Sequence, residues 1–286
     1  MQRFQFYNPR SVEDALNFLA EKGERSKIIA GGTDLIPGLR LEEIRPDFVL
    51  NIPEINPFRG IKEMDHSFWI GPTTTFTEMV ESNLLSRSFP ALVQSAASVG
   101  GPQIRNRGTI GGNIANASPA ADVLPALLAH GGELELQSKR NGKRIIPLAE
   151  AILSPYKTCF RSDEILTGII LKKLELGTRS AFEKLGRRKA MARARMNLTL
   201  LLRLNHREEV SELRIVPGAV MPVAKRMDRT ERMLLGKKPE PLLIEAASKT
   251  LAEEMVEVTG ARWSTEYKIP VLKNIFKRMM KQLLIV

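Results

Sequence analysis

Cysteine is nearly absent from this sequence: Cys159 is the single thiol among 286 residues. One thiol cannot close an intrachain disulfide, complete a cysteine zinc site or ligate an iron–sulfur cluster. The cysteine content therefore excludes a disulfide-stabilised scaffold and a chain that carries its own clusters, and it is typical of a reducing cytoplasm. The histidines His66, His130 and His206 are too scattered in the sequence to indicate a metal site. We expect no metal ligands and a cytoplasmic location.

Long hydrophobic runs are also missing. No apolar stretch approaches the roughly 18 residues that a membrane-spanning helix needs, so no membrane span is expected. The N-terminal stretch MQRFQFYNPR lacks the apolar core of a signal peptide. Hydrophobic residues nevertheless make up 43% of the chain, which is enough for a real core and, at this length, for more than one domain.

Aromatic residues are scarce, at 6%, whereas the formal net charge is +11. A basic chain often binds a polyanion, an acidic partner protein or a phosphorylated cofactor. The densest basic segment, Gly186–Arg195 (GRRKAMARAR), contains no aromatic residue on which a nucleic-acid base could stack. We therefore expect no nucleic-acid binding and interpret this segment as a solvated or subunit-facing surface.

The first of three predicted domains covers residues 1–57. A helix is predicted after Ser11, which forms a capping box with Asp14, and Gly23 ends it. Short apolar runs at 26–30 and 47–52 predict two strands around this helix. The second predicted domain, residues 58–176, combines a hairpin that turns near Asp65, helices within 89–101 and 119–132, a hairpin at 133–148 and a strand ending near 171.

Residues 177–286 form the third predicted domain. It begins with a strand at 180–186, continues through 191–204, where the pattern fits either a helix or a strand, and adds a strand at 212–220. Two helices follow, one after Pro241 and one from about Thr265. We expect the apolar stripe of the last helix to pack within its own domain; the stripe comprises Ile269, Leu272, Phe276, Met279 and Leu283.

Two glycine turns are the main candidates for a binding site. Neither fits the Rossmann pattern G-x-G-x-x-G or the P-loop pattern G-x-x-x-x-G-K-[ST]. Glycine turns can still hold an anion through backbone N–H groups, because the missing Cβ permits positive φ and close approach. Residues 30–34 (AGGTD) and 109–113 (TIGGN) each offer such a set, and together they suit a pyrophosphate. Asp122 follows, in a helix that we expect Ser118 to cap and Pro119 to start.

These stretches carry a family resemblance. IIAGGTDLIPGLR, QIRNRGTIGGNIANASPAAD, FEKLGRR and the C-terminal STEYKIPVLKNIFKRMMKQLL resemble the flavin-binding medium subunit of the molybdenum hydroxylases, the group of carbon monoxide and xanthine dehydrogenases. The resemblance covers almost the whole chain. It implies an α+β fold, with two subdomains of the vanillyl-alcohol-oxidase (PCMH) type that bind FAD. A smaller C-terminal α+β domain, with an antiparallel sheet and helices, is expected to cover the flavin.

The resemblance also implies a set of cofactor contacts. According to the resemblance, residues 28–35 and 109–113 hold the pyrophosphate. Asp122 accepts hydrogen bonds from FAD hydroxyls, and Lys184 comes near the flavin ring. A free lysine there would favour the anionic reduced flavin; the alternative is an ordinary surface lysine. The implied contact residues are Ile28, Ile29, Ala30, Gly31, Gly32, Thr33, Asp34, Leu35, Val99, Thr109, Ile110, Gly111, Gly112, Asn113, Asp122, Leu166 and Lys184.

The function implied is that of an oxidoreductase subunit. A molybdopterin-binding large subunit would oxidise the substrate, and a small subunit with [2Fe–2S] clusters would pass electrons to FAD here and on to NAD+ or another acceptor. No catalytic residue is assigned to this chain. The FAD is expected to be non-covalent, because Cys159 and the histidines lie outside the glycine motifs. Two alternatives stay open: a standalone FAD-dependent oxidase or reductase of the same fold, and a nucleic-acid or regulatory binding protein.

Overall fold

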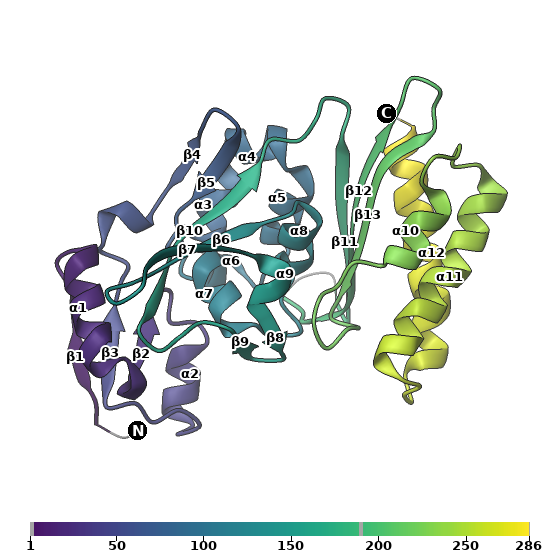
Figure 1. The fold of residues 1–286 in the computed structure, drawn as a ribbon. Helices are drawn as coiled ribbons and strands as arrows, with labels where there is room; N and C mark the ends of the chain where they lie inside the picture. The colour runs from purple at the N-terminus through teal and green to yellow at the C-terminus, as the bar shows by residue number, and fades with distance from the viewer. Residues whose placement is uncertain (1–2, 189–190, 286) are drawn as a thin grey trace. The chain divides into compact units, whose positions relative to one another are not determined.

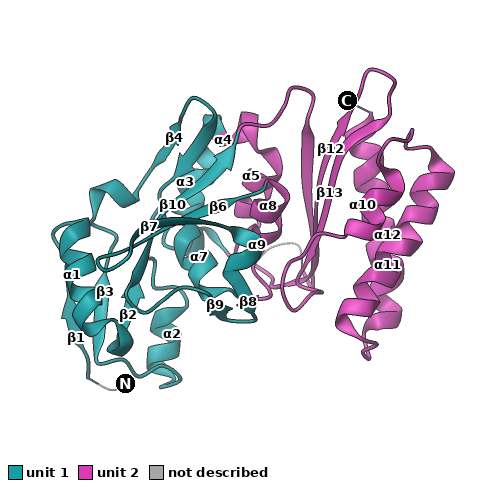
Figure 2. Ribbon diagram, in the orientation of Figure 1, with its two compact units in different colours: residues 1–84, 101–118, 131–172 teal, residues 85–100, 119–130, 173–286 magenta. Residues whose placement is uncertain are grey.

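The computed structural model describes residues 3–188 and 191–285. They form two compact units, shown in teal and magenta in Figure 2. Unit 1 consists of residues 1–84, 101–118 and 131–172, and unit 2 of residues 85–100, 119–130 and 173–286. Both units mix helices with sheets, so the α+β content expected from the sequence is present in each.

Unit 1 begins with a small parallel sheet. Its strands are β1 (Gln5–Tyr7), β2 (Ser26–Ile29) and β3 (Phe48–Asn51), in the order β1-β3-β2. Helix α1 (Val12–Lys22) joins β1 to β2, and α2 (Leu35–Arg40) follows β2. The buried face of α1 packs on Leu50 of β3, so the predicted strand–helix–strand arrangement is confirmed. Short 3-10 turns lie at Gly23–Arg25 and Asn56–Phe58.

The capping box predicted for α1 is only half formed. The Ser11 side chain accepts from the Asp14 N–H, as expected. The Asp14 carboxylate instead accepts from the Tyr7 hydroxyl at 2.6 Å and from the Arg10 N–H at 2.8 Å. Asp14 therefore ties the helix start to β1 rather than closing the box, because Tyr7 lies within reach of its carboxylate.

A five-stranded antiparallel sheet completes most of unit 1. Its order is β4 (Ile61–Glu63), β5 (Ser67–Ile70), β10 (Glu164–Lys172), β6 (Glu133–Ser138) and β7 (Gly142–Pro147). The β4–β5 and β6–β7 hairpins confirm the two hairpins predicted from turn residues. The central strand, β10, joins them by pairing with both β5 and β6.

Short elements connect these strands. They are α3 (Phe76–Glu81), α4 (Asn83–Ser88), α6 (Pro102–Arg105), α7 (Ile110–Asn116), α9 (Leu148–Ala151), β8 (Ile152–Ser154) and β9 (Lys157–Thr158). Thr75 caps α3 with a complete capping box to Glu78. The residues that precede this cap, 71–75, lie against the start of α7, which is important for the site described below.

Unit 2 is built on the antiparallel sheet β11-β12-β13, from β11 (Arg179–Gly186), β12 (Ala194–Leu204) and β13 (Val210–Gly218). Helices α10 (Asp228–Leu234), α11 (Pro241–Thr259) and α12 (Thr265–Leu284) cover one face (Figure 1). Helices α5 (Pro90–Ala97) and α8 (Val123–Ala129) cover the other face.

Burial on both faces of this sheet explains why the sequence pattern of residues 191–204 fitted either a helix or a strand. Leu198, Leu200 and Leu202 point into the hydrophobic core shared with α12, whereas Thr199 and Leu201 on the opposite face are buried as well. A strand that is buried on both faces reads as a continuous apolar run, so its period of two is hidden. The segment is a strand from Ala194.

The C-terminal helices agree with the sequence. Pro241 is the first residue of α11, and α12 starts at Thr265. Four residues of the predicted stripe on α12 are buried in the core of unit 2, and the fifth, Ile269, is partly buried against it. The stripe therefore packs within its own unit, as expected.

The start of α8 differs from the expectation. The helix begins at Val123, and Asp122 takes the N-cap position, whereas Ser118 and Pro119 lie outside it. Asp122 makes no capping bond, because its carboxylate is engaged elsewhere. The three larger sheets lie within residues 1–57, 58–176 and 177–286, and the two-stranded sheet of β8 and β9 also lies within 58–176, but the compact units join pieces of these stretches. We keep the three-domain division as a prediction.

Candidate functional site

The first glycine turn follows β2, and its backbone has free hydrogen-bond donors. Within the described residues, the N–H groups of Gly31, Gly32, Thr33 and Asp34 have no hydrogen-bond acceptor. Gly32 has φ of +74°, a conformation that side chains with a Cβ rarely adopt. Consecutive N–H groups around a left-handed residue form a concave nest that can bind an anion. The turn therefore has the local geometry that the predicted anion binding requires.

The second glycine turn lies directly beside the first, inside unit 1. A Cβ on Gly31 would overlap the carbonyl oxygen of Arg107 and lie 3.0 Å from the Cα of Gly108. The Asn116 side-chain amide donates to the Asp34 carboxylate at 3.1 Å, which links α7 to the first turn. Two segments far apart in sequence are thus brought together, and glycine at position 31 permits the contact.

The backbone of the second turn is not available as a second anion cradle. The Ile110 N–H donates to Thr74 O at 3.0 Å, and the Gly111 N–H to Pro72 O at 2.9 Å. The Gly112 N–H donates to the Thr109 hydroxyl at 3.1 Å. The expectation that both turns offer free amides is therefore wrong for these three N–H groups.

The strap that occupies the amides of Ile110 and Gly111, residues 71–75 (GPTTT), was missed by sequence reasoning. A Cβ on Gly111 would lie 2.6 Å from both Cβ and O of Pro72, so the strap and the turn pack without space between them. No local signal links positions that are about 40 residues apart, because the contact is made by tertiary packing.

Two features of the second turn still fit a ligand. Gly112 is exposed, and a Cβ built there would meet only the Thr109 hydroxyl, at 2.9 Å. The Asn113 Oδ1 is buried and has no hydrogen-bond partner among the described residues. A buried acceptor without a donor is costly unless a ligand supplies one. An oxygen of this kind suits a ligand hydroxyl rather than a phosphate.

Leu166 lies in β10 of the same unit, opposite Leu136. Its side chain is 7% exposed, so it belongs to the core. A β-bulge follows between Leu166 and Gly168, and a Cβ on Gly168 would overlap the indole of Trp69. The predicted contact of Leu166 with the cofactor stays a prediction.

The other predicted contact residues, Val99, Asp122 and Lys184, belong to unit 2. The Lys184 ammonium donates to Asp122 Oδ2 at 2.5 Å and to Ser98 O at 2.8 Å. The Asn197 side-chain amide donates to Asp122 Oδ1 at 2.9 Å. Val99 directly follows Ser98 at the end of α5, so these residues gather at one edge of the sheet.

This ion pair is buried, with side-chain exposures of 13% for Lys184 and 7% for Asp122. Burial raises the pKa of the Asp122 carboxyl above its usual value, and the Lys184 ammonium and hydrogen bonds from the Asn197 and Ser98 side chains oppose that shift. Lys184 is therefore neither a surface lysine nor a free cation: its charge is balanced by Asp122. With hydrogen bonds from Lys184, Asn197 and the Ser98 side chain, the Asp122 carboxylate keeps about one of its four lone-pair sites to accept from a ligand.

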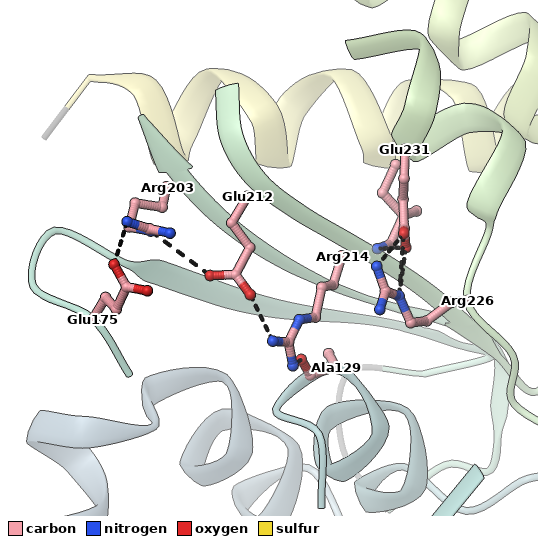
Figure 3. Close-up of polar contacts among 8 residues, drawn as sticks. Ala129, Glu175, Arg203, Glu212, Arg214, Arg226 and Glu231 are labelled. Atoms are coloured by element: carbon pink, nitrogen blue, oxygen red, sulfur yellow. Dashed lines mark hydrogen bonds and ion pairs between the residues drawn. The ribbon is translucent and has the colours of Figure 1, made fainter. Parts of the chain in front are cut away.

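A polar network at the other end of α8 holds this helix on the sheet. Arg214 of β13 donates to the carbonyl of Ala129, in the last turn of α8, at 3.0 Å. Glu212 accepts from Arg214 at 2.6 Å and lies 3.7 Å from the Arg203 guanidinium, so three charged side chains cross β12 and β13 in a row (Figure 3). Arg226 and Glu231 form a separate pair there at 2.5 Å. Because Arg214 anchors the C-terminus of α8, it helps to position Asp122 at the N-terminus.

His130, directly after α8, is a structural residue. Its Nδ1 lies 2.7 Å from Ala126 O and its Nε2 lies 3.2 Å from the Ser180 hydroxyl, which also accepts from the Ala91 N–H. Burial lowers the pKa of His130 to about 4. The neutral ring, with its proton on Nδ1, satisfies both contacts.

In the part of the chain that the structure describes, no cluster of metal-ligating side chains occurs and no helix is long and apolar enough to cross a membrane.

Comparison with protein-family models gives two matches. Residues 2–172 match the FAD binding domain in molybdopterin dehydrogenase, and residues 180–283 match the CO dehydrogenase flavoprotein C-terminal domain. The chain belongs to the family of FAD-binding subunits of the molybdenum hydroxylases. The resemblance inferred from the glycine motifs is thereby confirmed, together with FAD as the cofactor and the oxidoreductase class.

Individual relatives cover nearly the full length of the chain. The carbon monoxide dehydrogenase medium chain of Hydrogenophaga pseudoflava is 30% identical over 278 residues, with 97% of this chain and 96% of the relative covered. The xanthine dehydrogenase FAD-binding subunit of Escherichia coli O157:H7 is 30% identical and is covered to 94%, with 97% of this chain aligned.

Solved structures agree on the fold. A chain of the Hydrogenophaga pseudoflava carbon monoxide dehydrogenase that lacks the Mo-pyranopterin moiety superposes with a TM-score of 0.90 at 30% identity, covering 98% of this chain and 96% of that chain. A chain of the reconstituted enzyme of Oligotropha carboxidovorans gives 0.91 at 26% identity, covering 99% and 98%. The predicted two-subdomain FAD-binding fold with a C-terminal domain is the fold of this family.

Proposed function

We propose that this flavin-binding subunit is the electron-transfer subunit of a multi-subunit molybdenum hydroxylase. It would accept electrons from [2Fe–2S] clusters of a small partner subunit, after a molybdopterin-binding large subunit has oxidised the substrate. The electrons would leave through NAD+ or another acceptor. The observation that carries the cofactor side of the proposal is the nest of free N–H groups at residues 31–34. The medium-chain relatives support the subunit organisation.

The residues of unit 1 suit the phosphate and sugar parts of FAD. The N–H groups of Gly31–Asp34 would hold the pyrophosphate, because an anion satisfies several donors at once. Asn113 Oδ1 would accept from a hydroxyl group, which relieves its lack of a partner. The exposed face of Gly112 leaves room for the cofactor. No residue in these segments offers a covalent anchor, which supports non-covalent binding.

Asp122 and Lys184 of unit 2 are proposed to contact the same cofactor as a pair. FAD supplies the redox chemistry when bound, since its ring can accept and release electrons. The pair would present a strong local dipole rather than a full positive charge, because the Asp122 carboxylate lies 2.5 Å from the ammonium. Any effect of Lys184 on the flavin would therefore depend on Asp122.

The first experiment tests cofactor binding on the isolated chain. FAD is titrated into wild type, Gly112→Ala and Gly112→Asp, and flavin fluorescence quenching gives the Kd. Both substitutions add a Cβ at the same place, so their difference isolates the added negative charge, which should repel the FAD phosphates. Gly112→Asp is expected to raise the Kd at least about tenfold above Gly112→Ala, because a charge–charge contact at about 4 Å near a protein surface is worth up to about 4 kcal/mol and tenfold corresponds to about 1.4 kcal/mol. Equal Kd values would contradict the assigned phosphate site.

The second experiment tests the electron path in the assembled enzyme. The chain is co-expressed with a molybdopterin large subunit and a [2Fe–2S] small subunit, and the purified complex is reduced anaerobically with the large subunit's substrate. Loss of the oxidised-flavin absorbance after cluster reduction is the expected result. Reduction of the clusters without the flavin would exclude the proposed path. Turnover of a small substrate by the flavin-loaded chain alone would instead favour a standalone oxidase.

A further inference from the structure

A hollow of about 850 Å³ opens in unit 2. It is lined by the end of β11, the start of β12 and the residues that begin α12. The basic segment supplies one wall through Arg187, Arg188 and residues 191–195, whereas its Lys189 and Ala190 lie outside the described residues. Trp263 and Tyr267 supply another wall. The structure thus adds two aromatic residues to a segment that has none in its sequence.

Four of the positive charges in this hollow lack an acidic counterpart in the described part of the chain. No carboxylate of residues 3–188 or 191–285 forms an ion pair with Arg187, Arg193, Arg195 or Lys268. Lys268 is crowded by like charge: burial lowers the pKa of its ammonium, and Arg262 and Arg195 lower it further. Like charges that gather without counterions repel one another, so a negatively charged group in this hollow would be stabilised.

Three basic residues on the neighbouring helices are paired with carboxylates. Arg229 pairs with Glu257 at 2.8 Å, Lys277 pairs with Glu245 at 2.8 Å, and Arg278 pairs with Glu183. Other basic residues of unit 2 are exposed singly. The hollow differs from such a surface because four basic side chains without a carboxylate partner among the described residues line one cavity.

The apolar side chains in the hollow have the composition of a protein-binding surface. Trp263 is 92% exposed, Met191 is 60% exposed and Tyr267 is 48% exposed. The Arg195 guanidinium lies 6.0 Å from the centre of the Tyr267 ring, so charge and aromatic surface are adjacent. Tryptophan, tyrosine and arginine are the residues most enriched where partner proteins bind tightly. Trp263 projects into solvent, and Leu185, Met196 and Ala219 also line the hollow.

We propose that this basic and aromatic hollow docks an acidic, amphipathic segment of a partner subunit. Two or more carboxylates of that segment pair with Arg193, Arg195 and Lys268, and an apolar side chain of the segment covers Trp263. A free nucleotide satisfies the charges but brings no aliphatic side chain to the apolar lining, so the surface fits a protein segment better. The identity of the partner as a subunit of the same enzyme rests on the proposed function.

Charge reversal in the assembled complex tests the proposal. Arg193→Glu/Arg195→Glu is compared with Arg232→Glu/Lys281→Glu, a control that reverses two exposed charges on α10 and α12. Each chain is titrated against the co-expressed partner subunits, and assembly is followed by analytical ultracentrifugation at several salt concentrations. The hollow variant is expected to weaken assembly at least about tenfold and to flatten its salt dependence, while the control stays within about twofold of wild type. Equal effects of the two double variants would overturn the proposal.

A direct contact is tested by placing the photo-reactive residue p-benzoylphenylalanine at position 263 of the chain in the complex. The expected crosslink joins this position to a partner peptide that contains at least two Asp or Glu residues. A crosslink to a peptide without acidic residues, or only within this chain, would overturn the proposal. Protection of the amides around Trp263 by ATP or by a single-stranded oligonucleotide, but not by assembly, would assign the hollow to a nucleic-acid type of ligand instead.

FAD titration of the same variants separates the two proposals. Both double variants are expected to bind FAD with the wild-type Kd. If wild type and control assemble and the hollow variant assembles equally well, only the docking surface is wrong. If wild type binds FAD but forms no complex with either partner subunit, the proposed subunit function is wrong, and the docking proposal falls with it.

Discussion

The Lys184 ammonium lies 2.5 Å from the carboxylate of Asp122, although the two residues are 62 positions apart in the sequence. The pair is buried in unit 2 between the sheet edge and the start of α8, and Asn197 and the Ser98 carbonyl complete its hydrogen bonds. A buried ion pair with satisfied partners holds its surroundings in one arrangement, but each charge is costly without the other. Both residues were predicted to contact the cofactor, which stays a prediction, and the structure shows that they form one ion pair.

Removal of the lysine is expected to destabilise the protein. Lys184→Met leaves the Asp122 carboxylate buried without its cation, and the expected loss in free energy of unfolding is about 3–5 kcal/mol. Adding Asp122→Asn should recover part of this loss, because no uncompensated charge then remains. Urea denaturation of the two variants, with exposed Lys281→Met as the control, measures the effect. A Lys184→Met variant as stable as the control would show that the pair is not held in the folded protein.

Protonation of His130 is expected to weaken the fold in mild acid. Burial lowers its pKa to about 4 in the folded protein, below the ordinary 6.5 of the unfolded chain. Between these values the unfolded chain binds more protons, so stability is fully present above about pH 6.5 and falls as the pH decreases toward 4. The full change is about 3 kcal/mol.

Denaturation curves at pH 7 and pH 5 measure this effect. His130→Phe cannot be protonated, so its free energy of unfolding should change less between the two pH values than that of wild type, whatever its absolute stability. His66→Gln, at an exposed position, should retain the wild-type pH dependence. A similar pH dependence in His130→Phe and wild type would rule out His130 as the cause.

Alanine substitutions at the adjacent glycines 111 and 112 are expected to reduce the stability of the protein by different amounts. A Cβ at Gly111 meets Pro72 at 2.6 Å, so Gly111→Ala overpacks the contact with the strap and should cost about 1–3 kcal/mol of stability. Gly112→Ala meets only the Thr109 hydroxyl and should cost less. Thermal unfolding of the apo-protein distinguishes them. A larger loss at Gly112 than at Gly111 would contradict the packing of the strap.

The attachment of α8 to its sheet is expected to depend on Arg214. Arg214→Met removes the hydrogen bonds to Ala129 O and Glu212 and should cost about 1–3 kcal/mol, as for bonds made by a charged donor. Hydrogen exchange should quicken for the α8 amides, while those of α11 change less. Arg232→Met, at an exposed position, is the matched control. Unchanged α8 exchange in Arg214→Met would assign the anchoring to packing alone.

Local patterns in the sequence were sufficient for much of the fold. The helix of residues 12–22, the two hairpins and the helix that starts at Pro241 each depend on residues close together in the chain: a cap, a turn or a helical stripe. The family resemblance was available for the same reason, because the glycine motifs are continuous stretches. The nest at Gly31–Asp34 follows directly from one such stretch.

Tertiary structure alone decided the contacts that give these stretches their roles. The strap at residues 71–75 occupies the amides of Ile110 and Gly111, Asp122 neutralises Lys184, and Trp263 lies beside the basic segment. Each contact joins residues that are tens of positions apart, and the burial and charge balance of a side chain depend on what packs around it. The amino-acid sequence sets which chemical groups are present and which glycines permit close approach. Packing decides which backbone donors stay free for a cofactor and which charges stay unpaired. The reason is that hydrogen bonds and ion pairs join groups that are close in space, whatever their separation along the chain.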